Sequence, residues 1–516
     1  MAEDDVKSPQ KTGKRGHKRA VTAVTTVAVL FAAVATLGYL CLKDDIKKQG
    51  PVSEIVSRTG IAQETAAEDP ERLLAEKRAE ILARAQITAA MYDYDAAIEA
   101  VVSNVPDYPE HSDLAAFVTE CEEKKAGLVL WNEGDNSNVT HIFFHSLIVD
   151  TDAAFGSYKR DGYNQVMTTI PEFRSILDQM YDRGFVLVSL HDVAELRERE
   201  DGTVAMSFSP IYLPEGKIPF VLSQDDVCYY EYMKETGGFA NRIVVGEDGK
   251  PTCEMDLADG TSVRGEYDVV PIVDAFVEAH PDFSYRGAKG IIALTGYNGI
   301  LGYRTSELTY GEGDPNWSSA YIYRNPNIEA DRKTAKKVAK ALKADGWTFA
   351  SHTWGHMDMG DARGSDGNPT ERFYRDAEWW ETEVGSLIGP CDTIIFAFGA
   401  DIGPWQGYTD ANQMYVFLKD KGFDYFCNVD SSKHSWVQLS DSTYGGGYLR
   451  QGRRNLDGMM LFKDALYPDK EVFSDLIEPG SVFDKDRPLP VPGIPLPDGF
   501  DAQTWDAKEW ADAHKP

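Results

Sequence analysis

Two histidines and two aspartates are the residues of this chain whose types and spacing suggest catalytic chemistry. His352 and His356 stand four residues apart in WTFASHTWGHMD, and Asp225 and Asp226 are adjacent in FVLSQDDVCYY. Two neutral imidazoles and one carboxylate form a three-ligand set that leaves positions open on zinc or a similar divalent ion. The second carboxylate is then available as a base. The competing interpretations are loop histidines held by ordinary hydrogen bonds, and an aspartate pair that forms a turn or caps a helix.

The segments around these residues alternate between helical and strand patterns. Three of them combine an amphipathic helix, a glycine that ends it (Gly184, Gly346 or Gly422) and a strand of β-branched and aromatic residues. They are FRSILDQMYDRGFVLVSLHD, AKKVAKALKADGWTFASHTW and QMYVFLKDKGFDYFCNVDSS, and further candidate strands are THIFFHS, IPFVLSQ, GIIALTG, TIIFAFG and MMLF. This alternation predicts a parallel sheet with helical crossovers, and about seven or eight such strands favour a barrel.

The polar candidates follow the ends of the predicted strands. Asp225 and Asp226 follow one strand and His352 follows another, while Asp401 and Asp430 follow two more. In parallel α/β barrels the carboxyl ends of the strands meet at one edge, which carries the chemistry. The sequence therefore predicts that these distant residues converge.

These motifs resemble those of the polysaccharide deacetylases of the NodB-homology type, over roughly residues 140 to 465. SQDDV matches the two aspartates of the family's first motif, T-F-D-D-G, and HTWGH matches its second, H-[ST]-x-x-H. The resemblance implies that Asp225 is the general base and that Asp226, His352 and His356 bind a divalent metal, zinc with cobalt or nickel as alternatives. It also implies a distorted (β/α)7 barrel and hydrolysis of N- or O-acetyl groups from a glycan.

Two further motifs of the family are incomplete in this chain. The third, R-x-P-[YF], has Ile395 in place of the arginine that orients the base, and the fifth, L-x-H, aligns with MMLFKD and lacks the histidine that serves as acid. Candidate replacements for the arginine are Arg450, Arg453 and Arg454, and the candidate replacement for the acid is His434. The alternative is that these are surface charges and one loop histidine.

Phe398, Trp317 and Arg450 are the predicted substrate-binding residues. Phe398 aligns with the third motif, and Trp317 lies in a segment rich in glycine and tyrosine that could border a sugar cleft or simply pack as a lid. His145 and Ser146, at the end of the first predicted strand, are expected to be structural.

The chain outside the barrel begins with a basic stretch and an apolar run, AVTAVTTVAVLFAAVATLGYLCL, that is long enough to cross a bilayer. We expect a single-pass anchor in the cell membrane with the main domain outside the cell; a cleaved signal peptide is the alternative. A helical segment that begins at residue 70 resembles one tetratricopeptide hairpin. It is expected to form a stalk or cap packed on the main domain; the alternative is a repeat that binds a protein partner. The expected divisions are a cytoplasmic tail (1–19), the anchor (20–42), a linker (43–69), the helical segment (70–126), the catalytic domain (127–487) with a β-hairpin insertion (236–268), and a proline-rich tail (488–516) that wraps the surface or stays disordered.

Composition narrows the function of the 516-residue chain. Its formal net charge of -31 argues against nucleic acid as a partner. The six cysteines have no CxxC spacing and predict buried thiols or one disulfide rather than a zinc-cysteine site. Three functions stay open: a deacetylase of cell-surface glycans, a catalytically impaired relative that binds a glycan or a partner, and a scaffold that acts through the helical segment.

Overall fold

The computed structural model describes residues 70 to 515, except 258, 312–324, 366, 431–433 and 441–443. The chain divides into two compact units, and the elements below belong to the larger one, Ala75–Pro516, apart from the start of the first helix. The predicted basic tail, membrane anchor and linker lie outside the described residues. Within the described ranges, no helix has the length and apolar character needed to cross a membrane.

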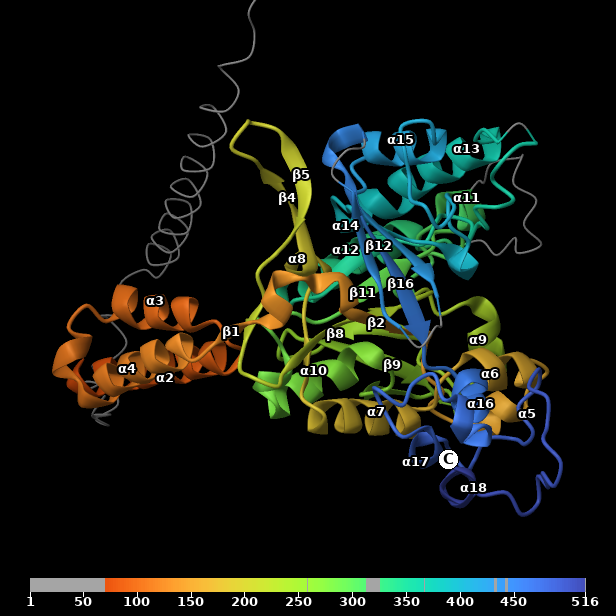
Figure 1. The fold of residues 1–516 in the computed structure, drawn as a ribbon, viewed down its shortest axis with the longest axis horizontal. Helices are drawn as coiled ribbons and strands as arrows, with labels where there is room; N and C mark the ends of the chain where they lie inside the picture. Colours follow the sequence, from red (N-terminus) through yellow and green to blue (C-terminus); the bar gives the residue numbers. More distant parts are fainter. Residues whose placement is uncertain are drawn as a thin grey trace, which may run out of the picture. The chain divides into compact units, whose positions relative to one another are not determined.

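Seven parallel strands of the described chain close into a barrel, which confirms the predicted α/β barrel in its coarse form (Figure 1). Both β2 and β11 pair with β7, and these two pairings close the ring. In order around the barrel the strands are β7 (Ile218–Gln224), β11 (Ile291–Leu294), β12 (Thr348–Ser351), β13 (Thr393–Ile395), β14 (Tyr425–Val429), β16 (Tyr448–Asn455) and β2 (Thr140–Phe144).

The barrel is irregular on one side. Strand β3 (Phe185–Leu187) pairs with the first half of β7, whereas β11 reaches only Ser223 and Gln224 at its end. Strand β15 (Val437–Ser440) pairs with β16 in the antiparallel direction. The closing contact of the ring is therefore confined to the carboxyl end of β7, next to Asp225.

Three of the helices between the strands end where the sequence predicted. Helices α7 (Ile170–Asp182), α12 (Ile328–Ala344) and α15 (Gln413–Asp420) each end two residues before a glycine with positive φ. Only glycine adopts this left-handed conformation at little cost, so it ends the helix and turns the chain into the next strand. The remaining crossover helices used below are α10 (Val269–Ala279), α13 (Glu371–Trp380) and α16 (Gly458–Leu466).

One predicted strand was wrong, and one barrel strand was not predicted. MMLF lies in α16, because the side chain of Asp457 accepts a hydrogen bond from Met460 N and caps a helix at this point. The seventh barrel strand is instead β16, whose sequence YLRQGRRN carries three arginines and was interpreted as a loop. Its arginines are buried at 3 % exposure or less, so they are not surface charges.

The insertion and the two ends of the described chain also carry regular structure. Strands β8 (Arg242–Val245), β9 (Pro251–Asp256) and β10 (Ser262–Gly265) form a three-stranded antiparallel sheet, one strand more than the predicted hairpin. A further hairpin, β4 (Ala194–Glu198) with β5 (Val204–Phe208), was not predicted.

The helical segment contains α2 (Pro70–Ala90), α3 (Tyr94–Asn104) and α4 (Ser112–Ala126), which share a small apolar core. The proline-rich tail packs through Val491 and ends in α18 (Ala507–His514). The five cysteines in the described ranges are unpaired thiols.

Candidate metal centre

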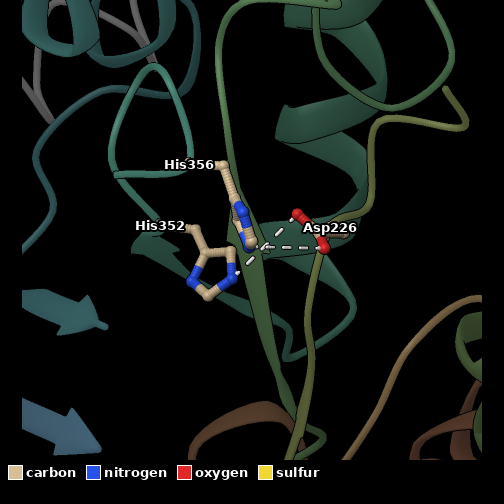
Figure 2. A group of neighbouring side chains, drawn as sticks. All are labelled: Asp226, His352 and His356. Carbon is tan, nitrogen blue, oxygen red and sulfur yellow. Dashed lines mark ion pairs between the residues drawn. The ribbon is translucent and has the colours of Figure 1, made fainter. Parts of the chain in front are cut away.

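Asp226, His352 and His356 come together at the carboxyl edge of the barrel. One ligand atom from each lies within 4.8 Å of the others, and Figure 2 shows the two imidazoles turned toward the carboxylate. Nε2 of His356 is 3.7 Å from Asp226 Oδ2, and Nε2 of His352 is 4.0 Å from Oδ1. Zinc holds nitrogen and oxygen ligands at about 2.0–2.2 Å, so donor atoms that share an ion stand roughly 3 to 4 Å apart. The spacing fits a divalent ion.

The loop after β12 holds both histidines in a non-helical conformation. The carboxylate of Asp376 in α13 accepts hydrogen bonds from Trp354 N and Gly355 N, both at 2.8 Å. The φ angles of His356 and of Asp226 are 50° and 60°, in the left-handed region that non-glycine residues rarely occupy. Such strained residues cluster at functional sites, where surrounding contacts hold them in place.

The protonation states around the cluster suit metal binding. Nδ1 of His352 lies 2.7 Å from the carbonyl oxygen of Ile395, and a proton on Nδ1 leaves the lone pair of Nε2 directed at Asp226. Burial lowers the pKa of His352, and the repulsion from His356 adds to it, against the attraction of the aspartates. Burial would raise the pKa of Asp226, but the combined effect of His356, His352, His145 and the hydrogen bond from Tyr230 lowers it. The site therefore presents a neutral imidazole and an ionised carboxylate.

Arg453 of β16 supplies the contact to Asp225 that the third motif lacks. Its Nη1 donates to Asp225 Oδ1 at 2.7 Å and its Nη2 donates to Oδ2 at 2.8 Å. Burial raises the pKa of Asp225, but Arg453 and His352 outweigh burial and bring it to about 2. Oδ2 of Asp225 is 4.0 Å from Nε2 of His352, so the ionised carboxylate borders the metal ligands. Of the three candidate arginines, Arg453 takes this position.

The other four predicted site residues have different outcomes. Phe398 lies at the cluster: its ring centroid is 4.4 Å from that of His356, and the side chain is 70 % exposed. Arg450 is buried in an ion pair with Asp401 at 2.9 Å, so it does not present its charge to a substrate as predicted. His434 is exposed and is not a member of the three-residue group of donor atoms. Trp317 lies outside the described residues.

His145 is a residue of the site that the sequence analysis treated as structural. It follows β2, whose last residue, Phe144, accepts a hydrogen bond from Asp225 N at 2.8 Å. A positive charge on His145 lowers the pKa of Asp225 and of Asp226, behind the larger contributions of burial and of the nearer cations. Its position at the end of a predicted barrel strand was the feature of the sequence that could have identified it as a site residue.

Tyr230 fixes the metal-binding carboxylate from the opposite side. Its hydroxyl donates to Asp226 Oδ1 at 2.5 Å, and its ring stacks on Tyr232 and Tyr297 with centroid distances of 5.3 Å and 5.4 Å. A hydrogen bond of this kind orients a ligating carboxylate, as partners around metal sites commonly do.

Comparison of the chain with known protein families, with curated proteins and with solved structures finds no match. The resemblance to the polysaccharide deacetylases therefore depends on the aspartate pair and the HTWGH motif.

Proposed function

We propose that the chain is a metal-dependent hydrolase that removes acetyl groups from a glycan, a function of the polysaccharide deacetylase type. The observation that carries the proposal is the group of Asp226, His352 and His356 beside Asp225, with Arg453 bound to that aspartate. When bound, a divalent ion supplies Lewis acidity that polarises an acyl carbonyl and lowers the pKa of a water molecule. With the predicted anchor at residues 20–42, this activity would act at the outer face of the cell membrane.

Asp225 acts as the base in this proposal. Its carboxylate is ionised at neutral pH, because its pKa is about 2, and the two hydrogen bonds from Arg453 fix its orientation. A carboxylate held beside the metal ligands can take the proton of an attacking water molecule. The role that the resemblance assigns to the third-motif arginine passes to Arg453.

His145 takes the role of the acid that the sequence analysis gave to His434. Nδ1 of His145 lies 3.1 Å from the carbonyl oxygen of Val166, so a proton on Nδ1 is held by the backbone. When the ring is doubly protonated, the second proton, on Nε2, is the one that passes to the leaving group. A departing amine or alkoxide must gain a proton, and a positioned imidazole provides one.

Acetate release tests the proposal. The full-length protein, loaded in turn with zinc, cobalt and nickel, is given acetylated chito-oligosaccharides and acetylxylan, with Asp225→Asn as the matched variant. We expect metal-dependent release that Asp225→Asn loses. Release that is independent of metal, or equal in the variant, would contradict the proposal.

Glycan binding without turnover is the second candidate function. Phe398 and Trp405 are 70 % and 82 % exposed, and flat exposed rings of this kind suit sugar rings whether or not hydrolysis follows. Saturable glycan binding by a metal-loaded protein that releases no acetate would favour this candidate.

A further inference from the structure

A large apolar cavity lies outside the barrel, behind the loop that carries the two histidines. Its volume is about 930 Å³, near the upper end of the roughly 300 to 1,000 Å³ that small-molecule sites occupy. Strands β12 and β13 form its inner wall, and α13 and α15 form its outer wall. Its large apolar lining residues include Phe349, Ile394, Phe373, Trp380, Leu418 and Met357.

The cavity follows a split between two barrel strands. Strands β12 and β13 pair only at Ser351 and Ile394, whereas β11 and β12 pair through four residues and β13 and β14 through three. A pocket of this volume against a splayed pair of strands is a candidate ligand site.

The polar groups inside the cavity already have partners. Both carboxylate oxygens of Asp376 accept backbone hydrogen bonds, the Thr353 hydroxyl accepts one from Met357 N, and the Trp380 indole donates to the carbonyl oxygen of Leu294. A ligand there gains chiefly apolar contact. The flexible side chain of Met357 can adjust to the shape of an apolar chain.

Two exposed lysines, Lys343 and Lys421, border the cavity. Lys343, in the last turn of α12, is exposed and lines the cavity, with its Nζ 5.7 Å from the centre of the Phe349 ring. It makes no ion pair with a carboxylate of the described chain, whereas Lys421, which also lines the cavity, pairs with Glu381 at 2.6 Å. The carboxylates that line the cavity have partners of their own: Asp376 accepts two backbone hydrogen bonds, Glu381 pairs with Lys421, and Asp392 pairs with His191 at 2.8 Å. Lys343 is therefore the cation that remains for a ligand, and an apolar interior with this cation at its edge is complementary to an amphiphile with an anionic end.

We propose that this cavity binds a single unbranched acyl chain with a carboxylate at its end. The carboxylate lies beside Lys343, and the chain runs between β12, β13 and α13 toward Met357. None of Asp225, Asp226, His352 and His356 lines the cavity, so this binding does not depend on the proposed hydrolase activity.

Displacement of a dansyl-labelled fatty acid from the zinc-loaded, full-length protein tests the proposal. We expect saturable binding of one probe per chain and displacement by palmitate. Ala377→Trp, which fills the cavity from α13, lowers the affinity for the probe by about tenfold or more. Ala330→Trp, at an exposed position of α12, leaves the affinity unchanged and controls for binding to other apolar parts of the chain.

The carboxylate is tested separately. Lys343→Glu lowers the affinity for palmitate by about threefold or more, since an exposed ion pair is lost and a repulsion replaces it, and leaves displacement by hexadecanol unchanged. Because Lys343 is exposed, this variant keeps the fold even if Ala377→Trp does not. Two results would overturn the proposal. One is an equal affinity for the probe in Ala377→Trp and Ala330→Trp; the other is an equal loss of affinity for palmitate and for hexadecanol in Lys343→Glu.

Discussion

Arg453 and Asp225, 228 residues apart in the chain, form a bidentate ion pair inside the barrel. The guanidinium also lies 4.1 Å from the centre of the Phe143 ring, and its exposure is 0 %. Two parallel hydrogen bonds fix a carboxylate in direction as well as in charge, which a lysine ammonium cannot do.

Replacing this arginine tests its role in orienting the base. Arg453→Lys keeps a positive charge but loses the forked contact, so we expect the pKa of Asp225 to rise and kcat/KM for acetate release to fall by about 100-fold, the usual cost of a misplaced catalytic group. The acidic limb of the pH profile moves to higher pH in this variant.

Arg450→Lys is the matched control for Arg453→Lys, because Arg450 is buried on the same strand and pairs with Asp401. We expect Arg450→Lys to lower the free energy of unfolding by a comparable amount and to leave the acidic limb of the pH profile unchanged. If the two variants shift kcat/KM and the pH profile equally, Arg453 has no orienting role.

Substitution of His145 tests the proposed acid. His145→Gln cannot protonate a leaving group, so we expect the rate of amide hydrolysis to fall by about 100- to 10,000-fold. Hydrolysis of p-nitrophenyl acetate falls much less, because its leaving group departs without a proton. His434→Gln leaves both rates unchanged. A uniform loss on both substrates in His145→Gln would show a structural role instead.

His141 makes the free energy of unfolding depend on pH. Burial lowers its pKa from 6.5 to about 3, with Arg453 adding to the effect. In the unfolded chain His141 is protonated as the pH falls below about 6.5, whereas in the folded chain it stays neutral down to about pH 3. The free energy of unfolding therefore decreases as the pH falls from about 6.5 to about 3, by up to about 1.4 kcal/mol per pH unit.

Denaturant unfolding between about pH 7 and pH 4 measures this dependence. His352, whose pKa is also lowered, contributes in the same direction, so the comparison of the wild type with His141→Gln isolates the His141 part. We expect a shallower dependence on pH in the variant, and identical slopes would contradict the assignment.

The parts of the fold that follow simple sequence rules could be predicted. Predicting the helices that end before Gly184, Gly346 and Gly422 required only two signals: amphipathic periodicity, and a residue that tolerates positive φ. The convergence of Asp226 with His352 followed from the rule that strand ends share one edge of a parallel barrel.

Other parts could not be predicted because local sequence and tertiary structure disagree. Strand β16 lacks the apolar alternation of a predicted strand because it carries Arg450, Arg453 and Arg454. These arginines are buried only because carboxylates outside the strand, Asp401, Asp225 and Asp475, pair with them. MMLF is a short apolar run, and such runs do not distinguish a strand from a buried helix. The place of His145 beside Asp225 depends on the pairing of β2 with β7, which no single segment encodes.

Metal content tests the central claim most directly. Full-length protein is loaded with zinc, passed through a desalting column and measured by plasma mass spectrometry, alongside His352→Ala, His356→Ala and His434→Ala. We expect one zinc per chain in the wild type and in His434→Ala. In the two ligand variants we expect little retained zinc, because losing a ligand lowers the affinity for zinc by more than the roughly 10- to 100-fold that losing a partner of a ligand costs. A wild-type protein that retains no divalent ion, or ligand variants that retain as much zinc as the wild type, would contradict the claim that Asp226, His352 and His356 form a metal site.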